Sequence, residues 1–101
     1  MSSSPRFSLN AEAWSDITEI LDVTRDAWGE LQVQKYADAL NRGLRTVEDF
    51  PDAGRRRDDL RPGLRIFPVE RHVILYEKHG DTVVVLRIVH QRQRLDDLAF
   101  E

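Results

Sequence analysis

Apolar and polar residues at the start of the chain follow first the period of a strand and then that of a helix. Arg6 to Leu9 alternate between polar and apolar side chains, which predicts a short first strand. Asn10 is a favourable helix N-cap, and the acidic Glu12 suits the positive end of a helix dipole. A helix is then predicted from a stripe spaced by three and four residues, comprising Ala13, Trp14, Ile17, Ile20, Leu21, Thr24 and Trp28.

A second amphipathic helix is predicted directly after the first. Gly29 should end the first helix, and Glu30 should begin the second. The second helix should end before Phe50-Pro51, because proline disfavours helical geometry in the preceding residue. Two helices with so short a connection should pack as an antiparallel hairpin. The apolar stripe of the second helix consists of Val33, Tyr36, Ala37, Leu40, Leu44 and Val47.

The second half of the chain changes to the two-residue period of strands. Residues 51–63 contain two prolines and two glycines without an apolar period, which predicts a loop. The tail over residues 94–101 has enough apolar residues, at Leu95, Leu98 and Phe100, for one or two helical turns. Strands rich in Val, Ile and Leu are predicted over Leu64–Val69, His72–Glu77 and Thr82–Val89.

The element order β-α-α-β-β-β predicts an α+β domain with a helix hairpin on one face of a mostly antiparallel four-stranded sheet. Counting reversals of chain direction makes the first strand antiparallel to the last. Pro68 cannot donate a ladder hydrogen bond, so its strand should lie at an edge. The strand order 1-4-3-2 satisfies both conditions, and it places the apolar run Thr82–Val89 in a covered, central position.

The length and composition indicate one small domain. Half of 101 residues would give a core of doubtful stability, so we expect a single unit over 1–101, in which residues 1–4 fray. No apolar run is long enough to span a membrane, and no signal peptide is recognisable, so we expect a cytoplasmic protein. The absence of cysteine excludes disulfides, a thiol nucleophile and a cysteine zinc site.

The charge is distributed unevenly along the chain. The formal net charge is −3, and the isoelectric point near 5.6 does not suit a general nucleic-acid binder. Residues 1–50 carry nine acidic and five basic side chains, whereas residues 51–101 carry nine acidic and ten basic ones. A local site for a polyanion or a carboxylate in the second half therefore stays open.

No catalytic or metal-binding signature is present, so we expect neither a metal nor a cofactor. Two interpretations fit the arginines Arg55, Arg56, Arg57, Arg61 and Arg65: a binding surface, or a solvated loop neutralised by nearby aspartates. A histidine among arginines could move a proton near a phosphate, which makes Arg87, His90, Arg92 and Arg94 a second candidate. Arg87 and His90 would face opposite sides of a regular strand, and a structural histidine that closes the strand against the C-terminal segment is the commoner outcome.

The helix hairpin carries more apolar surface than one sheet face needs to cover. Excess apolar surface of this kind marks a partner site, and a partner helix in a groove or a strand added at the sheet edge would be the natural binding mode. Trp14 and Trp28 are the largest residues of this surface.

Several short segments, spread over nearly the whole chain, form a recognisable series. They are Phe7-Ser8-Leu9-Asn10-Ala11-Glu12-Ala13, Trp28-Gly29, Phe50-Pro51 with Gly54-Arg55, Arg61-Pro62-Gly63-Leu64-Arg65, Phe67-Pro68-Val69 with His72-Val73-Ile74-Leu75-Tyr76, and Arg87-Ile88-Val89-His90-Gln91-Arg92. Each alone is weak, but in their order and spacing they resemble the ParE toxins of the RelE/ParE superfamily. The chain departs from the expected pattern at Glu70, where the hairpin turn should have glycine.

The resemblance implies a non-enzymatic toxin of a bacterial type II toxin–antitoxin module that poisons DNA gyrase and blocks replication. It also implies neutralisation by a ParD-like antitoxin, whose own DNA-binding domain would provide the link to DNA. The antitoxin would bind the hairpin at Trp14, Ile17, Leu21, Tyr36 and Leu40. The residues that contact the target and cause toxicity would be Arg61, Arg65, Arg87, His90 and Arg92.

Two other functions are compatible with the same fold. One is a ribosome-dependent messenger RNA endonuclease of the RelE type, although such enzymes are strongly basic and this chain is acidic. The other is an inactive toxin that survives as an antitoxin-binding module.

Overall fold

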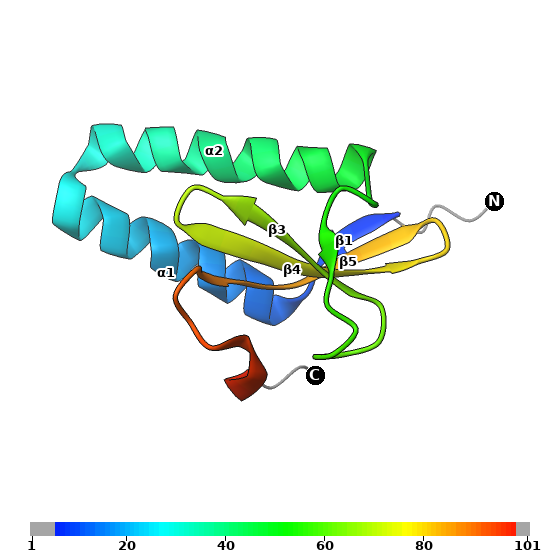
Figure 1. Cartoon of the computed structure of the whole chain (residues 1–101). Coiled ribbons are helices and arrows are strands. Elements are labelled where there is room, and N and C mark those ends of the chain that lie inside the picture. Colours follow the sequence, from blue (N-terminus) through cyan, green and yellow to red (C-terminus); the bar gives the residue numbers. More distant parts are fainter. Residues whose placement is uncertain (1–5, 99–101) are drawn as a thin grey trace.

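The computed structural model describes residues 6–98 as two helices packed on a five-stranded mixed sheet (Figure 1). The expectations for residues 1–4 and for Phe100 lie outside the described residues, whereas the helical turn expected in the tail is present. The elements are β1 (Phe7–Leu9), α1 (Ala11–Trp28), α2 (Glu30–Asp49), β2 (Arg55–Arg56), β3 (Leu64–Val69), β4 (His72–His79), β5 (Thr82–His90) and the 3-10 turn η1 (Leu95–Asp97).

The helix boundaries predicted from the sequence are confirmed. The Asn10 side chain accepts a hydrogen bond from the Ala13 backbone N–H at 3.0 Å, as an N-cap should. Gly29 separates the helices at a φ of 89°, a conformation that residues with a side chain rarely adopt. The helix α2 ends at Asp49, directly before Phe50-Pro51.

The sheet differs slightly from the predicted one in strand count and order. The four expected strands are neighbours as predicted, but the full order is β1-β5-β4-β3-β2, so β2 extends the sheet beyond β3 within the segment expected to be a loop. Only Arg55 and Arg56 pair with β3, opposite Ile66 and Arg65. β3 is therefore not the edge strand that Pro68 predicted, although Pro68 itself lies past the end of this pairing and faces no further described strand.

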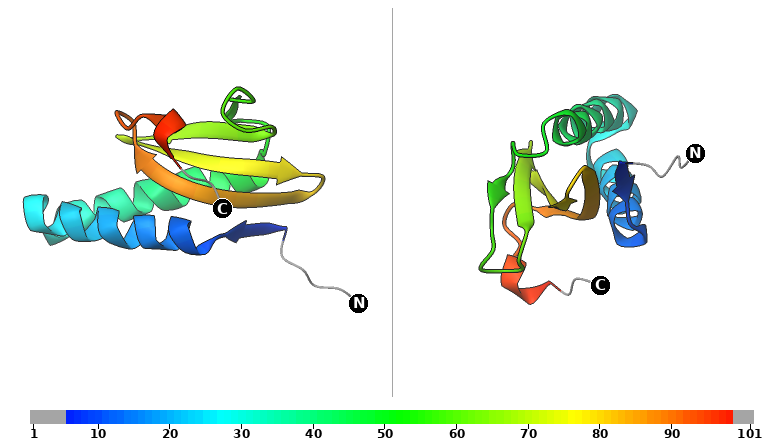
Figure 2. Two further views of the ribbon diagram at one scale, coloured as in Figure 1. Left: turned by 90° about the horizontal axis from the view of Figure 1, so that it is seen from below. Right: turned by 90° about the vertical axis from the view of Figure 1, so that its right-hand side faces the viewer.

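The predicted direction of the first strand is wrong, because β1 pairs with β5 in parallel. Asn10 alone connects β1 to α1, and the helix continues in the direction of the strand (Figure 2). The chain therefore does not reverse at this point, and every later element runs opposite to the direction counted from the sequence.

The helices cover one face of the sheet, and η1 lies against the other (Figure 2). Between helices and sheet, the core includes Ala13, Leu40, Val47, Ile74 and Tyr76. On the opposite face a smaller cluster of Leu64, Leu75, Leu86 and Val89 is covered partly by Leu60, Leu95 and Leu98. β5 is buried on both faces for this reason, as its continuous apolar pattern indicates.

Candidate functional site

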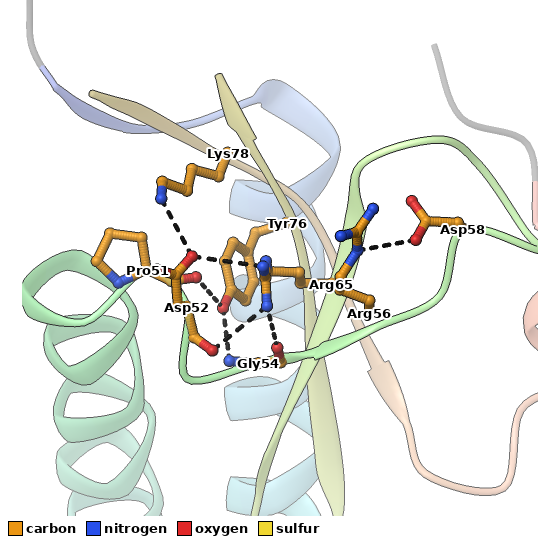
Figure 3. Close-up of polar contacts among 8 residues, drawn as sticks. All are labelled: Pro51, Asp52, Gly54, Arg56, Asp58, Arg65, Tyr76 and Lys78. Atoms are coloured by element: carbon orange, nitrogen blue, oxygen red, sulfur yellow. Dashed lines mark hydrogen bonds and ion pairs between the residues drawn. The ribbon is translucent and has the colours of Figure 1, made fainter. Parts of the chain in front are cut away.

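The arginine-rich segment is held to the sheet by a buried tyrosine of β4 (Figure 3). The Tyr76 hydroxyl donates a hydrogen bond to the Pro51 carbonyl at 2.7 Å and accepts one from the Gly54 N–H at 2.8 Å. A Cβ atom at Gly54 would lie 2.4 Å from that hydroxyl oxygen, so no larger residue fits. The segment Phe50-Pro51 to Gly54-Arg55 thus forms a fixed turn clamped onto the core.

Arg65 belongs to this clamp. Its guanidinium donates to the Gly54 carbonyl at 2.7 Å and lies 3.4 Å from the Asp52 carboxylate. Lys78 approaches the same carboxylate at 3.1 Å, and its hydrogen bond is the main cause that lowers the pKa of Asp52 (Figure 3). Because these contacts occupy the Arg65 head group, this residue positions the turn and is poorly placed to bind a target.

The other arginines of the loop are paired with acidic residues, except Arg55, which has no ion pair with any residue from 6 to 98. Arg56 pairs with Asp58 at 2.8 Å, and Arg57 binds both oxygens of Asp59 at 2.9 Å. Hydrogen bonding lowers the pKa of both aspartates, mainly from the Gly63 N–H at Asp58 and from Arg57 at Asp59. Arg61 lies 2.5 Å from the buried carboxylate of Glu77. This geometry favours the interpretation of a neutralised loop over that of a basic binding surface.

Arg87 also has a structural partner. Its guanidinium binds Asp16 of α1 through two contacts of 2.7 and 3.1 Å, and both side chains are largely buried. The same carboxylate accepts the Ile88 N–H at 3.0 Å. The register of β4 and β5 shifts next to Arg87, since Leu75 pairs with Arg87 and Tyr76 with Val85, a bulge that the sequence pattern did not indicate.

His90 and Arg92 are exposed where β5 ends, and the structure adds Arg71 to them. The Gln91 N–H donates to the Arg71 carbonyl at 2.8 Å, so the turn before β4 lies beside the end of β5. Neither Arg71 nor Arg92 has an ion pair with any described residue. We call Arg71, His90 and Arg92 the basic end. Arg71 was not identified from the sequence, because only the pairing of His72 with His90 brings it there.

A chain of polar rings leads from the basic end into the molecule. The rings of His72 and His90 meet edge to face at 5.4 Å, and the His72 Nδ1 is hydrogen bonded to the Tyr36 hydroxyl. That hydroxyl accepts the Arg71 N–H at 3.2 Å. Burial raises the pKa of Tyr36, whereas burial and then the charge of His90 lower the pKa of His72. Tyr36 therefore keeps its proton and His72 is neutral near neutral pH.

The five residues expected to bind an antitoxin do not line one groove. Leu40 is 2% exposed and belongs to the core, and Ile17 and Leu21 pack partly buried against it. Trp14 is 59% exposed and lies in a depression along α1, whereas Tyr36 borders a different one between α2 and the turn at Glu70. Trp14 is the one member of the set that offers a large exposed apolar surface.

Metal binding and membrane insertion find no support in residues 6–98. No group of three or more histidine, aspartate or glutamate side chains is arranged to hold a metal ion within this range. Neither described helix combines the length and apolar character needed to cross a membrane.

Comparison with known proteins gives consistent matches along nearly the whole chain. Residues 7–95 match the family model described as the ParE toxin of the type II toxin–antitoxin system parDE. Toxin ParE1 of Mycobacterium tuberculosis is 34% identical over 94 residues, covering 92% of this chain and 96% of that protein. Toxin ParE of Escherichia coli is 31% identical over 90 residues, covering 88% and 87%.

A solved structure shares the fold. A chain of the chromosomal ParDE toxin–antitoxin system from P. aeruginosa superimposes with a TM-score of 0.73, covering 88% of this chain and 98% of its own. The sequence identity is 19%, so this match supports the architecture and not the individual site residues.

Proposed function

Because this chain belongs to the ParE toxin family of type II toxin–antitoxin systems, we propose that it inhibits DNA gyrase and thereby blocks replication, and that a ParD-like antitoxin neutralises it. The family match over residues 7–95 carries this proposal. Gyrase acts in the cytoplasm, so the toxin would act there too.

The arrangement of side chains supports binding to a target in place of catalysis on it. Arg65 and Arg87 are engaged in structural contacts, and Arg61 lies against Glu77. His72 is neutral and hydrogen bonded to a tyrosine that retains its proton. RNA cleavage would need an acid and a base placed on either side of the scissile phosphate, and the side chains named here are held in structural contacts instead.

The surfaces for the two partners would lie on different elements. The target would meet the basic end, where His90 and Arg92 keep the role implied by the family resemblance and Arg71 joins them. Arg61, Arg65 and Arg87 would affect toxicity through folding. The antitoxin would cover the helix hairpin beginning at Trp14, which is the exposed residue of the set expected there.

The proposal is tested by a supercoiling and DNA-cleavage assay with purified gyrase and this protein. We expect inhibited supercoiling or trapped cleavage complexes, reversed by a ParD-like antitoxin that binds the chain. A parallel assay with ribosomes and messenger RNA checks the alternative chemistry. Cut messenger RNA with unaffected gyrase would contradict the proposal, and inactivity in both assays would indicate an inert binding module.

The double variant Arg71→Ala/Arg92→Ala tests the basic end. We expect it to lose growth inhibition at equal protein level, because it removes two exposed charges that form no ion pair with a described residue, and it leaves the core unchanged. Arg42→Ala/Arg45→Ala is the matched control, since it removes two exposed arginines from α2 and should leave growth inhibition unchanged. Equal toxicity of the two double variants would show that the basic end does not contact the target.

A further inference from the structure

The helix hairpin extends past the sheet and exposes two large apolar side chains where its helices meet. In two perpendicular views, the connection between α1 and α2 projects beyond the strands (Figures 1 and 2). Trp28, the last residue of α1, is 68% exposed, and Leu31, the second residue of α2, is 67% exposed. We call Trp28 and Leu31 the apolar tip. Neighbouring exposed apolar residues of this size are typical of an interaction surface.

The last turns of α1 lie beside the basic end. Thr24 and His90 line one depression between α1 and the end of β5. Trp28 follows Thr24 by four residues, which places the two side chains on the same face of the helix, about 6 Å apart along its axis. Trp28 thus overhangs the His90 side of the basic end by one helical turn.

The first turns of α2 lie beside the other side of the basic end. Lys35 lines a second depression together with Tyr36 and Glu70. The Tyr36 hydroxyl accepts the Arg71 N–H at 3.2 Å, which fixes this part of α2 next to the turn between β3 and β4. Leu31 precedes Lys35 by four residues and shares its helix face. The apolar tip therefore continues the basic end along both helices, and the two form one surface.

The charges closest to the apolar tip are acidic. Asp26 and Glu30 stand on either side of Trp28 in the sequence, and both are exposed. Arg25 is bound to Asp22 at 3.1 Å and to Glu30 at 2.6 Å, so its charge is already compensated. These carboxylates would repel the phosphates of a nucleic acid or of an anionic membrane. An exposed indole in such surroundings suits an apolar pocket on a protein.

We propose that the apolar tip enters an apolar pocket on the protein surface of gyrase, and that carboxylates around this pocket pair with the basic end. The inference rests on the proposed function and specifies which part of the chain anchors the target. Tryptophan in a closed pocket is among the strongest anchors of protein interfaces, whereas the exposed charges beside it mainly guide the encounter. The target surface would then include the far end of the hairpin, about 21 Å along α1 from Trp14.

The test compares Trp28→Ala with Phe50→Ala in the full-length protein. Phe50 is 67% exposed at the other end of α2, so the two changes remove aromatic rings of nearly equal exposure. Trp28→Ala should weaken both binding to purified gyrase and inhibition of supercoiling by at least about tenfold, whereas Phe50→Ala should change them by less than about twofold. Equal effects of the two variants would overturn the proposal.

Leu31→Ala provides a second, independent variant of the tip. It should also weaken gyrase binding, by about threefold or more, because a smaller apolar contact is lost. Thermal unfolding of all three variants should resemble that of the unmodified protein, since each of these side chains is mostly exposed. Unchanged gyrase binding by folded Leu31→Ala would limit the anchor to Trp28 and contradict a two-residue tip.

Salt distinguishes the apolar contact from the charge pairs beside it. The loss of gyrase affinity caused by Trp28→Ala should be the same in about 0.05 and about 0.5 M salt, because burial of an indole is not screened. The loss caused by Arg71→Ala/Arg92→Ala should shrink over the same range, because exposed charge pairs are screened. A Trp28→Ala effect that disappears in high salt would contradict an apolar pocket.

Two further measurements test other occupants of the tip. Binding of the protein to duplex DNA without gyrase should not depend on Trp28, and a loss there equal to the loss with gyrase would assign the tip to nucleic acid. Light scattering should show no dimer that Trp28→Ala dissociates. Such a dimer would assign the tip to a second copy of this chain, and either result would refute the proposal.

Growth inhibition separates this inference from the proposed function. A protein that inhibits gyrase equally well with and without Trp28 would keep the proposed function and refute the tip as its anchor. A protein that leaves gyrase unaffected, but loses growth inhibition in Trp28→Ala and keeps it in Phe50→Ala, would refute the function and retain the tip as the contact with a different target.

Discussion

Glu70 adopts the left-handed conformation at the turn between β3 and β4, with a φ of 55°. The family resemblance leads one to expect glycine there, and the backbone keeps the conformation that glycine adopts easily. A residue with a Cβ atom is strained in this region by about 1–2 kcal/mol. The departure in sequence therefore changes the energy of the turn and not its shape.

We predict that Glu70→Gly raises the free energy of unfolding by about 1 kcal/mol, after the entropic cost of glycine in the unfolded chain is subtracted. Gly80→Ala is the opposite control, because Gly80 has a φ of 60° and open space where a Cβ atom would lie, so only backbone strain should act. Gly80→Ala should lower the free energy of unfolding by a similar amount. Urea titration measures both, and changes of the same sign would contradict the prediction.

His72 couples the stability of the protein to pH. Its neighbours are Tyr36 from α2, His90 from β5 and the Asp16 carboxylate from α1. Burial, followed by the charge of His90, lowers its pKa below 6.5, and Asp16 opposes this shift. The unfolded chain then binds the His72 proton more readily than the folded one does, so protonation favours unfolding.

The stabilising contribution of neutral His72 should be complete above pH 6.5 and should be lost as the pH falls toward the lowered pKa of the folded state. We predict that His72→Gln, which cannot titrate, loses less stability than the unmodified protein between pH about 7 and about 5. Urea titrations across this range measure the difference. A parallel decline of the two proteins would show that other groups cause the acid sensitivity.

At the scale of elements, the Asp16 side chain accepts a backbone hydrogen bond from β5 beyond the point where β1 ends. β1 pairs with Val83, Val84 and Val85 and then ends, which leaves the rest of that edge of β5 without a partner strand. α1 continues along the same line, and Asp16 accepts the Ile88 N–H while binding Arg87. One carboxylate thus completes the sheet edge and fixes α1 against β5.

We predict that Asp16→Asn lowers the free energy of unfolding by about 2 kcal/mol, because it leaves the largely buried Arg87 charge without its partner. Asp22→Asn is the control on the same helix. It removes an exposed ion pair with Arg25 and should change stability by less than about 0.5 kcal/mol. Thermal or urea unfolding measures the two variants, and equal losses would refute the structural role of Asp16.

In the arginine-rich segment after α2, the local sequence predicted the turn, whereas the contacts that hold the turn depend on tertiary packing. Pro51 and Gly54 correctly indicated a turn, but not the Tyr76 hydroxyl that binds it or the short strand β2. Two paired residues are too few to produce a period in the sequence. The contact of Tyr76 with Gly54 spans 22 positions, so no local pattern could reveal it.

At the scale of the whole molecule, charge is distributed unevenly over the surface. The helix α1 carries five acidic residues and one basic residue, whereas Arg71, His90 and Arg92 meet where β4 begins and β5 ends. The net charge of −3 gives no sign of this separation. The two proposed partners would contact different parts of the molecule, and each would meet a surface of different charge.

The sequence alone determined those features that depend on neighbours in the chain. Periodicity, the Asn10 cap, Gly29 and Pro51 predicted the helices, and the apolar run of β5 indicated a central position in the sheet. Tertiary structure decided the parallel pairing of β1, the burial of Leu40 and the structural roles of Arg65 and Arg87. These depend on where a side chain ends in space: Asp16 meets Arg87 across 71 positions, a distance over which no sequence period carries information.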